Sequence, residues 1–418
     1  MPFTEACWTR REVMRFLAVT GVLPVAARPA GACDGEKLLL LNSCDPVGVK
    51  QLAAAGNQAI EAEFARLRKD AGAWLSQGPW SVTSVRPENT PAGPNDFFSE
   101  GPYWWPDPAN PNAPYVRRDG EVNPQRFTRN DADLGKLCNA VLCLATAAHL
   151  LSGEPEAARY GQHAWNLLRV WFADAKTRMN PNLEFGQAVR GRVWGRGIGL
   201  IDTVPMIYLV QGVMLLGVLP GKDTSTEREF RAWLRDFLRW MLTSEKGVDE
   251  RDQGNNHSTW WAAQVAAYAT YLKDDRALLE AWKLYFEKLV PGQLLPDGSA
   301  PKEEERTRSL SYSAMNLDGL ALLCRMGQFW EMELWEYEAA NGASVAKSIA
   351  YLMPFLEDPA KWKKQQITPL DRSRTIFPAL AGWGLAKPEY LDAQRRLGCE
   401  GREFSRWARL LLALPASG

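Results

Sequence analysis

Apolar residues recur at the spacing of an α-helix along most of the chain. Such stripes of apolar residues run through 47–75, 155–173, 203–218, 226–243, 257–272, 275–290, 312–327, 343–355 and 402–413. A further stripe, which begins at Asp133, has apolar residues at i, i+3, i+4 and i+7, namely Leu134, Leu137, Cys138, Val141, Leu142, Ala145 and Ala148. Prolines and glycine-rich joints separate the stripes, and no convincing period-two pattern interrupts them. The sequence therefore predicts an all-α protein.

Successive helical stripes with short joints predict antiparallel helix pairs. A solenoid would show a sequence repeat of fixed length, and none is visible. We therefore expect an α/α toroid, an incomplete barrel of helix pairs. The length of 418 residues would allow two or three domains, but toroids of one domain reach this size. We predict a single domain over 33–418.

Two irregular segments, 77–130 and 179–197, break the helical pattern. The first is rich in Pro, Gly, Asn and aromatic residues, and its aromatic content argues against disorder. We interpret it as an ordered loop over one mouth of the toroid. Flat indoles stack on sugar faces, although any one of the 18 tryptophans could instead serve packing. The candidate substrate-binding residues in the two segments are Trp104, Trp105, Asn182, Gln187, Trp194 and Arg196; for Asn182 and Gln187, bracing of the loop is the alternative.

Residues 1–32 resemble an export signal. Arg10 and Arg11 form a twin-arginine-like start, followed by a modest apolar run over 16–27 and by small residues up to Ala32. The alternative is an amphipathic first helix. We expect a periplasmic or secreted protein with no membrane span, and Cys33 is a weak candidate for lipidation.

Charge and cysteine content exclude several classes of partner. Lysine and arginine number 49 and so do aspartate and glutamate, so bulk charge does not indicate a nucleic-acid partner, and any polyanion site must be local. The seven cysteines include no CxxC pair, and three histidines are too few for a histidine-rich metal centre. We expect no metal and no cofactor.

Two short segments carry the chemistry. The first is Asn255, Asn256 and His257, which stand where one helical stripe begins, with Asn255 the expected N-cap. The second is 306–312, which contains two arginines and Tyr312 and leads into another helical stripe. Amide and cationic donors can neutralise a carboxylate, and an imidazole or phenol can move a proton next to it. β-Elimination in a uronic acid polymer needs both functions. Tyr312 could act as base and then as acid if an arginine lowers its pKa from about 10.

Several motifs in order resemble the alginate lyase domain of polysaccharide lyase families five and thirty-eight, and they lie closer to thirty-eight. The similarity spans about 95–330 and includes 255–260, 296–299 and 306–317. It implies an α/α toroid that cleaves 1,4-linked uronates, such as polymannuronate or β-glucuronan, without a cofactor. It also implies that Asn256 and Arg306 neutralise the carboxylate, that Tyr312 transfers protons, and that His257 neutralises or acts as base. Ser258 and the spacing at 306–308 depart from the pattern.

Alternatives remain at this level. Arg308 is a candidate substrate ligand or a structural partner of a glutamate in 303–305. A glycoside hydrolase on the same fold would need two carboxylates that flank the bond, and the sequence offers Asp133, Asp202 and Asp252 without marking a pair. A glycan-binding protein without activity is the third possibility. The oligomeric state and the choice between endo and exo cleavage stay open.

Overall fold

The computed structural model describes residues 37–42, 44–110, 112–330, 332–399 and 403–413. The expected export signal and Cys33 lie outside these ranges. The helices are α2 Cys44–Ala54, α3 Gln58–Trp74, α4 Arg129–Leu150, α5 Ala157–Leu168, α6 Met206–Gly217, α7 Thr224–Thr243, α8 Glu245–Arg251, α9 Asn256–Leu272, α10 Asp275–Leu284, α11 Val290–Gln293, α12 Pro301–Glu304, α13 Ser309–Gln328, α14 Val345–Glu357, α15 Phe377–Gly384, α16 Pro388–Leu397 and α17 Glu403–Leu411.

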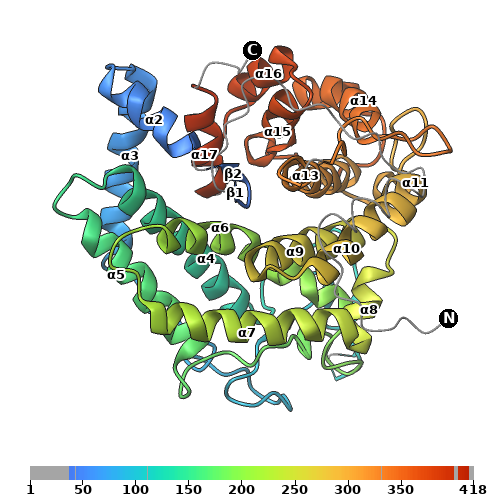
Figure 1. Ribbon diagram of the computed structural model, residues 1–418. Coiled ribbons are helices and arrows are strands. Elements are labelled where there is room, and N and C mark those ends of the chain that lie inside the picture. Colours follow the sequence, from blue (N-terminus) through green and yellow to red (C-terminus); the bar gives the residue numbers. More distant parts are fainter. Residues whose placement is uncertain (1–36, 43, 111, 331, 400–402, 414–418) are drawn as a thin grey trace.

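The helices are arranged in a ring (Figure 1). Helices α4, α6, α9, α13 and α15 contact one another in that order, and α5, α10, α14 and α16 pack against α4, α9, α13 and α15 respectively. Helix α17 returns to α3 and α4. This arrangement is the predicted α/α toroid.

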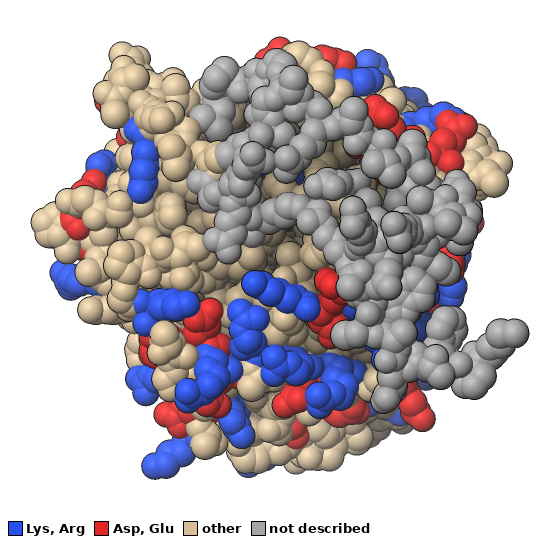
Figure 2. Space-filling model, in the orientation of Figure 1, with Lys and Arg blue, Asp and Glu red and all other residues tan. Residues whose placement is uncertain are grey.

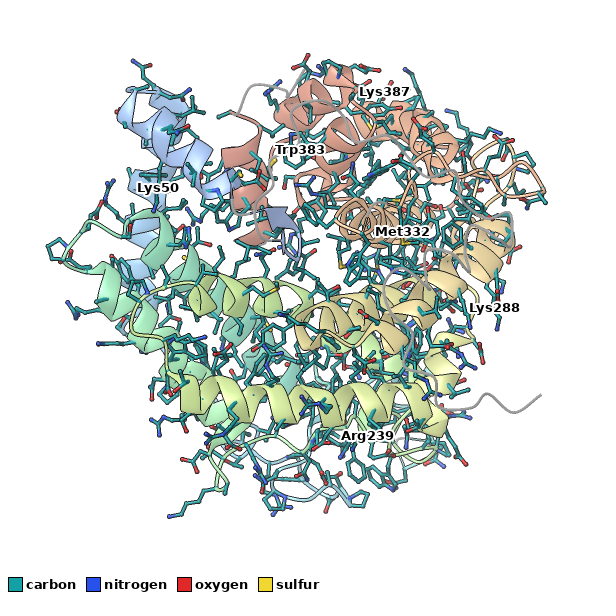
Figure 3. All side chains as sticks on the ribbon, viewed as in Figure 1. Lys50, Arg239, Lys288, Met332, Trp383 and Lys387 are labelled. Carbon is teal, nitrogen blue, oxygen red and sulfur yellow. The ribbon has the colours of Figure 1, made fainter. Side chains whose placement is uncertain are left out.

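Composition explains which helices lie inside. Helix α6 is apolar along nearly its whole length and α9 is rich in alanine, and both are buried on almost every side. Helix α7 buries one stripe that includes Phe230, Leu234 and Phe237, and its other face carries charge. Arg239 on α7 and Lys288 on the π-helical turn η3 (Tyr285–Leu289) lie on the outside of the ring (Figure 3).

The charged outer surface is mixed in sign. Figure 2 shows Lys and Arg side chains gathered on the lower part of one face, with acidic side chains among them. On α7, Arg239 pairs with Asp236 and Arg231 with Glu227. Such pairs at i, i+3 and i, i+4 belong to a solvated helix face.

The helix predictions were largely confirmed, with local differences. The stripe over 47–75 forms two helices, because Gly56 takes a φ of 75° and the Asn57 side chain caps α3 by accepting the N–H groups of Ala59 and Ile60. The expected helices over 155–173 and 275–290 end in π-helical turns, η1 (Arg169–Ala173) and η3. Helices α8, α12, α15 and α16 lie outside the predicted stripes and were missed.

Strands are few and short within the described residues. β1 (Lys37–Leu38) pairs with β2 (Leu41–Asn42), β4 (Trp104–Trp105) pairs antiparallel with β5 (Val116–Arg117), and β3 (Phe98–Glu100) pairs parallel with β6 (Phe185–Ala188). The last pair joins the two irregular segments to each other. The segment 77–130 is thus an ordered loop, as expected.

No single helix in the described ranges has the length and apolar character that a membrane crossing requires. One bent pair, the 3-10 helix η2 (Gly197–Thr203) with α6, meets the length and composition criteria together. Burial of α6 inside the ring accounts for that composition.

The hairpin at Lys37–Asn42 inserts into the ring. Leu38 to Leu41 are each at most 2% exposed. The backbone N–H of Leu40 donates to Gln211 of α6 (2.8 Å), and Arg325 of α13 donates to the Leu40 carbonyl (3.1 Å). The hairpin therefore links two inner helices that are distant in sequence.

We expect Leu40→Ala to lower the free energy of unfolding by about 2–5 kcal/mol, because a fully buried side chain would leave a cavity. Val47→Ala is the matched control, since Val47 is 52% exposed a few residues further on. Urea denaturation of both variants measures the difference. Equal midpoints for the two variants would contradict a structural role for the hairpin.

Candidate active site

Helix α9 begins at the first predicted motif. The Asn255 side chain accepts the N–H of His257 at 3.0 Å, so Asn255 is the N-cap that the sequence predicted. Asn256 and His257 follow in the first turn of α9, where free N–H groups and the helix dipole favour negative charge.

A buried carboxylate holds Asn256. Its backbone N–H donates to Glu303 Oε1 (2.6 Å) and its Nδ2 donates to Oε2 (2.7 Å), and both residues are 1% exposed. Burial raises the pKa of Glu303, and the bonds from Asn256 oppose that rise. One hydrogen of the Asn256 amide is therefore committed to Glu303.

A second buried carboxylate holds His257. His257 Nδ1 lies 3.0 Å from Glu250 Oε1; the Glu250 side chain is fully buried and the His257 side chain is 16% exposed. Burial alone lowers the pKa of His257, but the negative charge and hydrogen bond of Glu250 outweigh burial, and the pKa lies above its usual value.

Arg306 links the irregular loop to α13. It donates to both carboxylate oxygens of Asp119 (2.8 and 3.2 Å) and to the hydroxyl of Tyr312 (2.9 Å). Its guanidinium carbon lies 4.0 Å from the centre of the Tyr312 ring. Burial would raise the pKa of Asp119, but the bonds from Arg306 and Thr307 hold it well below its usual range. Gly120 makes this approach possible, because a Cβ there would lie 2.4 Å from Thr307 Oγ1.

Tyr312 differs from its prediction in one respect. Its hydroxyl lies 2.6 Å from that of Tyr103. Burial and Tyr103 raise the pKa of Tyr312 well above its usual range, and the neighbouring Arg306 does not reverse this. Arg306 acts to lower this pKa, as the sequence suggested, but burial and Tyr103 outweigh that one cation, so the net pKa is raised. The phenol therefore holds its proton in the free protein.

The predicted ligands in 179–197 form a braced network. Gln187 donates to Asp202 (3.0 Å), and its side-chain and backbone oxygens both accept from Arg196. Burial lowers the pKa of Arg196 to about 10. Asn182 accepts the N–H of Glu184 in a tight turn. These bonds brace the segment, and contact of Asn182, Gln187 and Arg196 with substrate stays a prediction.

The predicted tryptophans stand next to arginines. The guanidinium groups of Arg192 and Arg196 lie 5.3 and 5.7 Å from the ring centre of Trp104. Arg118 lies 5.0 Å from the ring of Trp105, whose indole N–H donates to the Glu121 carbonyl. Trp194 is 42% exposed. Aromatic faces beside cations suit an anionic sugar chain.

Arg308 pairs through its backbone with Gln366 rather than with a glutamate. Among the described residues, Glu303 binds Asn256 and Glu304 pairs with Lys364, and no ion pair joins Arg308 to 303–305. The Arg308 Nε is buried without a hydrogen-bond partner there. Its candidacy as a substrate ligand therefore persists.

The carboxylates considered for hydrolysis have local partners. Asp133 on α4 pairs with Arg129 and Lys136, and Asp252 pairs with Arg251 and Lys288. Asp202 accepts from Ser99 and Gln187.

Across the described ranges, no group of three His, Cys, Asp or Glu side chains could hold a metal ion.

Sequence reasoning missed Glu250, Glu303, Asp119 and Tyr103 as parts of the site. Tyr103 and Asp119 lie in the irregular loop whose composition had marked it as functional. Glu303 was considered only as a partner of Arg308, and nothing in the sequence marked Glu250 or pointed to the actual partners of the two glutamates, which lie 7 and 47 positions away.

The fold and these motifs correspond to known proteins. The chain resembles an alginate lyase from Bacteroides ovatus, with a TM-score of 0.82 and 27% identity over 92% of this chain and 100% of that chain. It shares its fold with a variant of alginate lyase A1-III complexed with a tetrasaccharide (TM-score 0.54, 18% identity, 86% and 94% covered). It also shares its fold with alginate lyase A1-III from Sphingomonas species A1 (TM-score 0.50, 18% identity, 85% and 94% covered). No curated protein sequence matched.

These similarities define the class, a polysaccharide lyase on an α/α toroid. The family profile of alginate lyases matches residues 81–362, and the chain belongs to the alginate lyase family. The match extends beyond the 95–330 predicted from motifs. A closer relation to family thirty-eight stays a prediction.

We expect Arg306→Lys to reduce kcat strongly and Arg306→Ala to reduce it further. The ammonium of lysine cannot replace the planar guanidinium, which donates two parallel hydrogen bonds to a carboxylate. Loss of a contact that strengthens in the transition state lowers kcat together with kcat/KM. Asp119→Asn is the matched control, because it breaks the same ion pair and keeps the guanidinium. If Arg306→Lys and Asp119→Asn lower the melting temperature equally and both keep the wild-type kcat, Arg306 is only a structural partner. Arg308 then becomes the candidate for neutralising the substrate carboxylate.

Proposed function

We propose that the protein cleaves a 1,4-linked polyuronate by β-elimination at the cluster of Asn256, His257, Arg306 and Tyr312. The observation that carries the proposal is the Tyr312 hydroxyl held between Arg306 and Tyr103. The backbone N–H of Arg306 donates to the carbonyl of Glu303 (3.2 Å), and the Glu303 side chain holds Asn256 at the start of α9. A proton donor, a cation and an amide are thus joined through direct contacts.

The donors address the charge of the uronate carboxylate. Removal of the proton at C5 builds negative charge next to an existing carboxylate, so donors aimed at that group lower the barrier. The second hydrogen of the Asn256 amide and the Nη1 of Arg306 are assigned this role. Nη1 has no hydrogen-bond partner among the described residues, whereas Nε binds Asp119 and Nη2 binds Asp119 and Tyr312.

Two groups transfer the protons. His257 takes the proton from C5, the electron pair of the C5–H bond forms the C4–C5 double bond, and the C4–O4 bond breaks. Tyr312, which its raised pKa keeps protonated in the free protein, gives its proton to the departing O4. Proton exchange with solvent then returns His257 to the neutral form and Tyr312 to the phenol.

Polymannuronate, as in alginate, and β-glucuronan are the proposed substrates. Two observations support an alginate substrate: the Bacteroides ovatus protein of similar structure is an alginate lyase, and an A1-III structure contains a tetrasaccharide. β-Glucuronan is proposed because it presents the same 1,4-linked uronate carboxylate and C5 proton. The arginine-flanked Trp104 and Trp105 would stack on neighbouring sugars and face their carboxylates.

A panel of polymannuronate, polyguluronate, β-glucuronan and a glycosaminoglycan, assayed by the ultraviolet absorbance of unsaturated uronate, tests the proposal. We expect activity on polymannuronate or β-glucuronan. Tyr312→Phe should lower kcat by about 10²–10⁴ and leave KM nearly unchanged, because only the transferable proton is lost. More than a tenth of the wild-type rate in this variant would refute the assignment, and new reducing ends without unsaturated product would indicate hydrolysis.

We further propose that the protein is exported and that its mature form starts near residue 33. The twin-arginine-like start supports this, and a cut near 33 would leave the buried hairpin from Lys37 intact. Cys44 is disulfide-bonded, which favours an oxidising compartment. Intact-mass analysis of exported protein measures the start, and a soluble cytoplasmic form that retains Met1 would reverse the localisation.

A further inference from the structure

Glu250 is a buried carboxylate with one described side-chain partner. Its Oε1 lies 3.0 Å from His257 Nδ1, whereas its Oε2 is buried and has no hydrogen-bond partner among the described residues. A buried carboxylate is costly unless it is hydrogen-bonded or balanced by charge. The imidazole of His257 is therefore the group on which the charge of Glu250 depends.

The backbone fixes this pair. Helix α8 starts directly after α7, where Ser244 caps it by accepting the N–H of Gly247, and a Cβ at Gly247 would lie 2.1 Å from the Met241 carbonyl. Gly254, with a φ of 67°, turns the chain from α8 into α9 and donates its N–H to Ser258 at 2.7 Å. Glu250 and His257 are thus set on two helices joined by one tight turn.

The surrounding charges act on the pair from several elements. Arg196 and Asp202 act from the segment before α6, and Asp249 acts from α8 itself. Glu303 on α12 supports a positive His257, whereas Arg306 opposes it. Burial raises the pKa of Glu250, and the cation of His257 lowers it. Among the groups that raise the pKa of His257, Glu250 has the largest effect.

We propose that Glu250 is a positioning residue for the elimination: it accepts the Nδ1–H of His257 and so presents Nε2 to the substrate as the base. Carboxylates orient catalytic imidazoles in this way by fixing the tautomer and by stabilising the imidazolium that forms. Nε2 takes the C5 proton, and the carboxylate of Glu250 balances the resulting charge without taking a proton itself. The inference rests on the proposed function, in which His257 is the base.

The experiment compares Glu250→Gln with Glu250→Asp and with Glu63→Gln. Gln removes the charge, Asp keeps it, and Glu63 is a buried carboxylate on α3 that pairs with Arg409. The chain has three histidines, so the imidazole signals in ¹⁵N NMR can be assigned by substitution. Burial lowers the pKa of His149 to about 4, which separates that signal from His257.

The negative charge of Glu250 sets the direction in which the pKa of His257 should change. Because Glu250 raises the pKa of His257, Glu250→Gln should move the NMR midpoint of His257 to lower pH and reduce the preference for the Nδ1–H tautomer. Since a base must be neutral, the acidic limb of the kcat/KM profile should move to lower pH as well. The plateau should fall about tenfold or more, because the weaker base is no longer oriented. Glu250→Asp should retain part of the midpoint shift, and Glu63→Gln should match the wild type.

An unchanged midpoint and tautomer of His257 in Glu250→Gln would overturn the inference regardless of activity. The inference would also be overturned if the NMR midpoint of His257 fell but the acidic limb of the kcat/KM profile did not move with it. That result would hold whether the alkaline limb moved or neither limb did, since His257 would then not be the base. Failure of the proposed function is a separate result, namely no unsaturated product from any polyuronate with the wild-type enzyme. The NMR measurement needs no substrate and still decides whether Glu250 holds His257.

Discussion

Two buried carboxylates behind the first turn of α9 are the constraint on which the site depends. Burying a carboxylate costs several kcal/mol unless its oxygens are hydrogen-bonded, and the positive end of a helix dipole offsets part of this cost. Glu303 meets the requirement through two bonds from Asn256, whereas Glu250 has only its Oε1 paired, with His257, and its Oε2 has no hydrogen-bond partner among the described residues. The same bonds leave the two side chains with one orientation each. Orientation of the candidate catalytic groups is therefore a consequence of satisfying buried charge.

The toroid and the irregular loop have different tasks. The ring supplies rigid helix starts, and the loop supplies Tyr103, Trp104 and Asp119. Arg306 joins the two, since one guanidinium binds the loop carboxylate and the hydroxyl of Tyr312 on α13. Loop and helix thus cannot move independently at the site. This division, a rigid scaffold with binding groups on an ordered loop, is a common arrangement in enzymes.

Burial decides the acid–base character of the site more than sequence neighbours do. An arginine six positions before Tyr312 suggested a lowered phenol pKa, but the hydroxyl is enclosed and paired with Tyr103, and its pKa is raised. In His257 the charge of the fully buried Glu250 outweighs the effect of burial on the imidazole, so this pKa is raised as well. The pKa values of both groups thus lie above their ordinary values, that of Tyr312 through burial and that of His257 through a neighbouring charge.

The sequence by itself predicted the α/α toroid and most of its helices, because helical periodicity and caps such as Asn255 are local properties. The four candidate catalytic residues came from the chemistry of their side chains and from the resemblance to the alginate lyase domain, and their roles stay a prediction. It also placed the irregular loop and its tryptophans. The tertiary structure alone decided the contacts of Glu303 with Asn256, of Asp119 with Arg306 and of Tyr103 with Tyr312, which join residues 47, 187 and 209 positions apart. Such pairs leave no periodic trace in the chain, since they arise only when ring closure brings distant segments into one buried site.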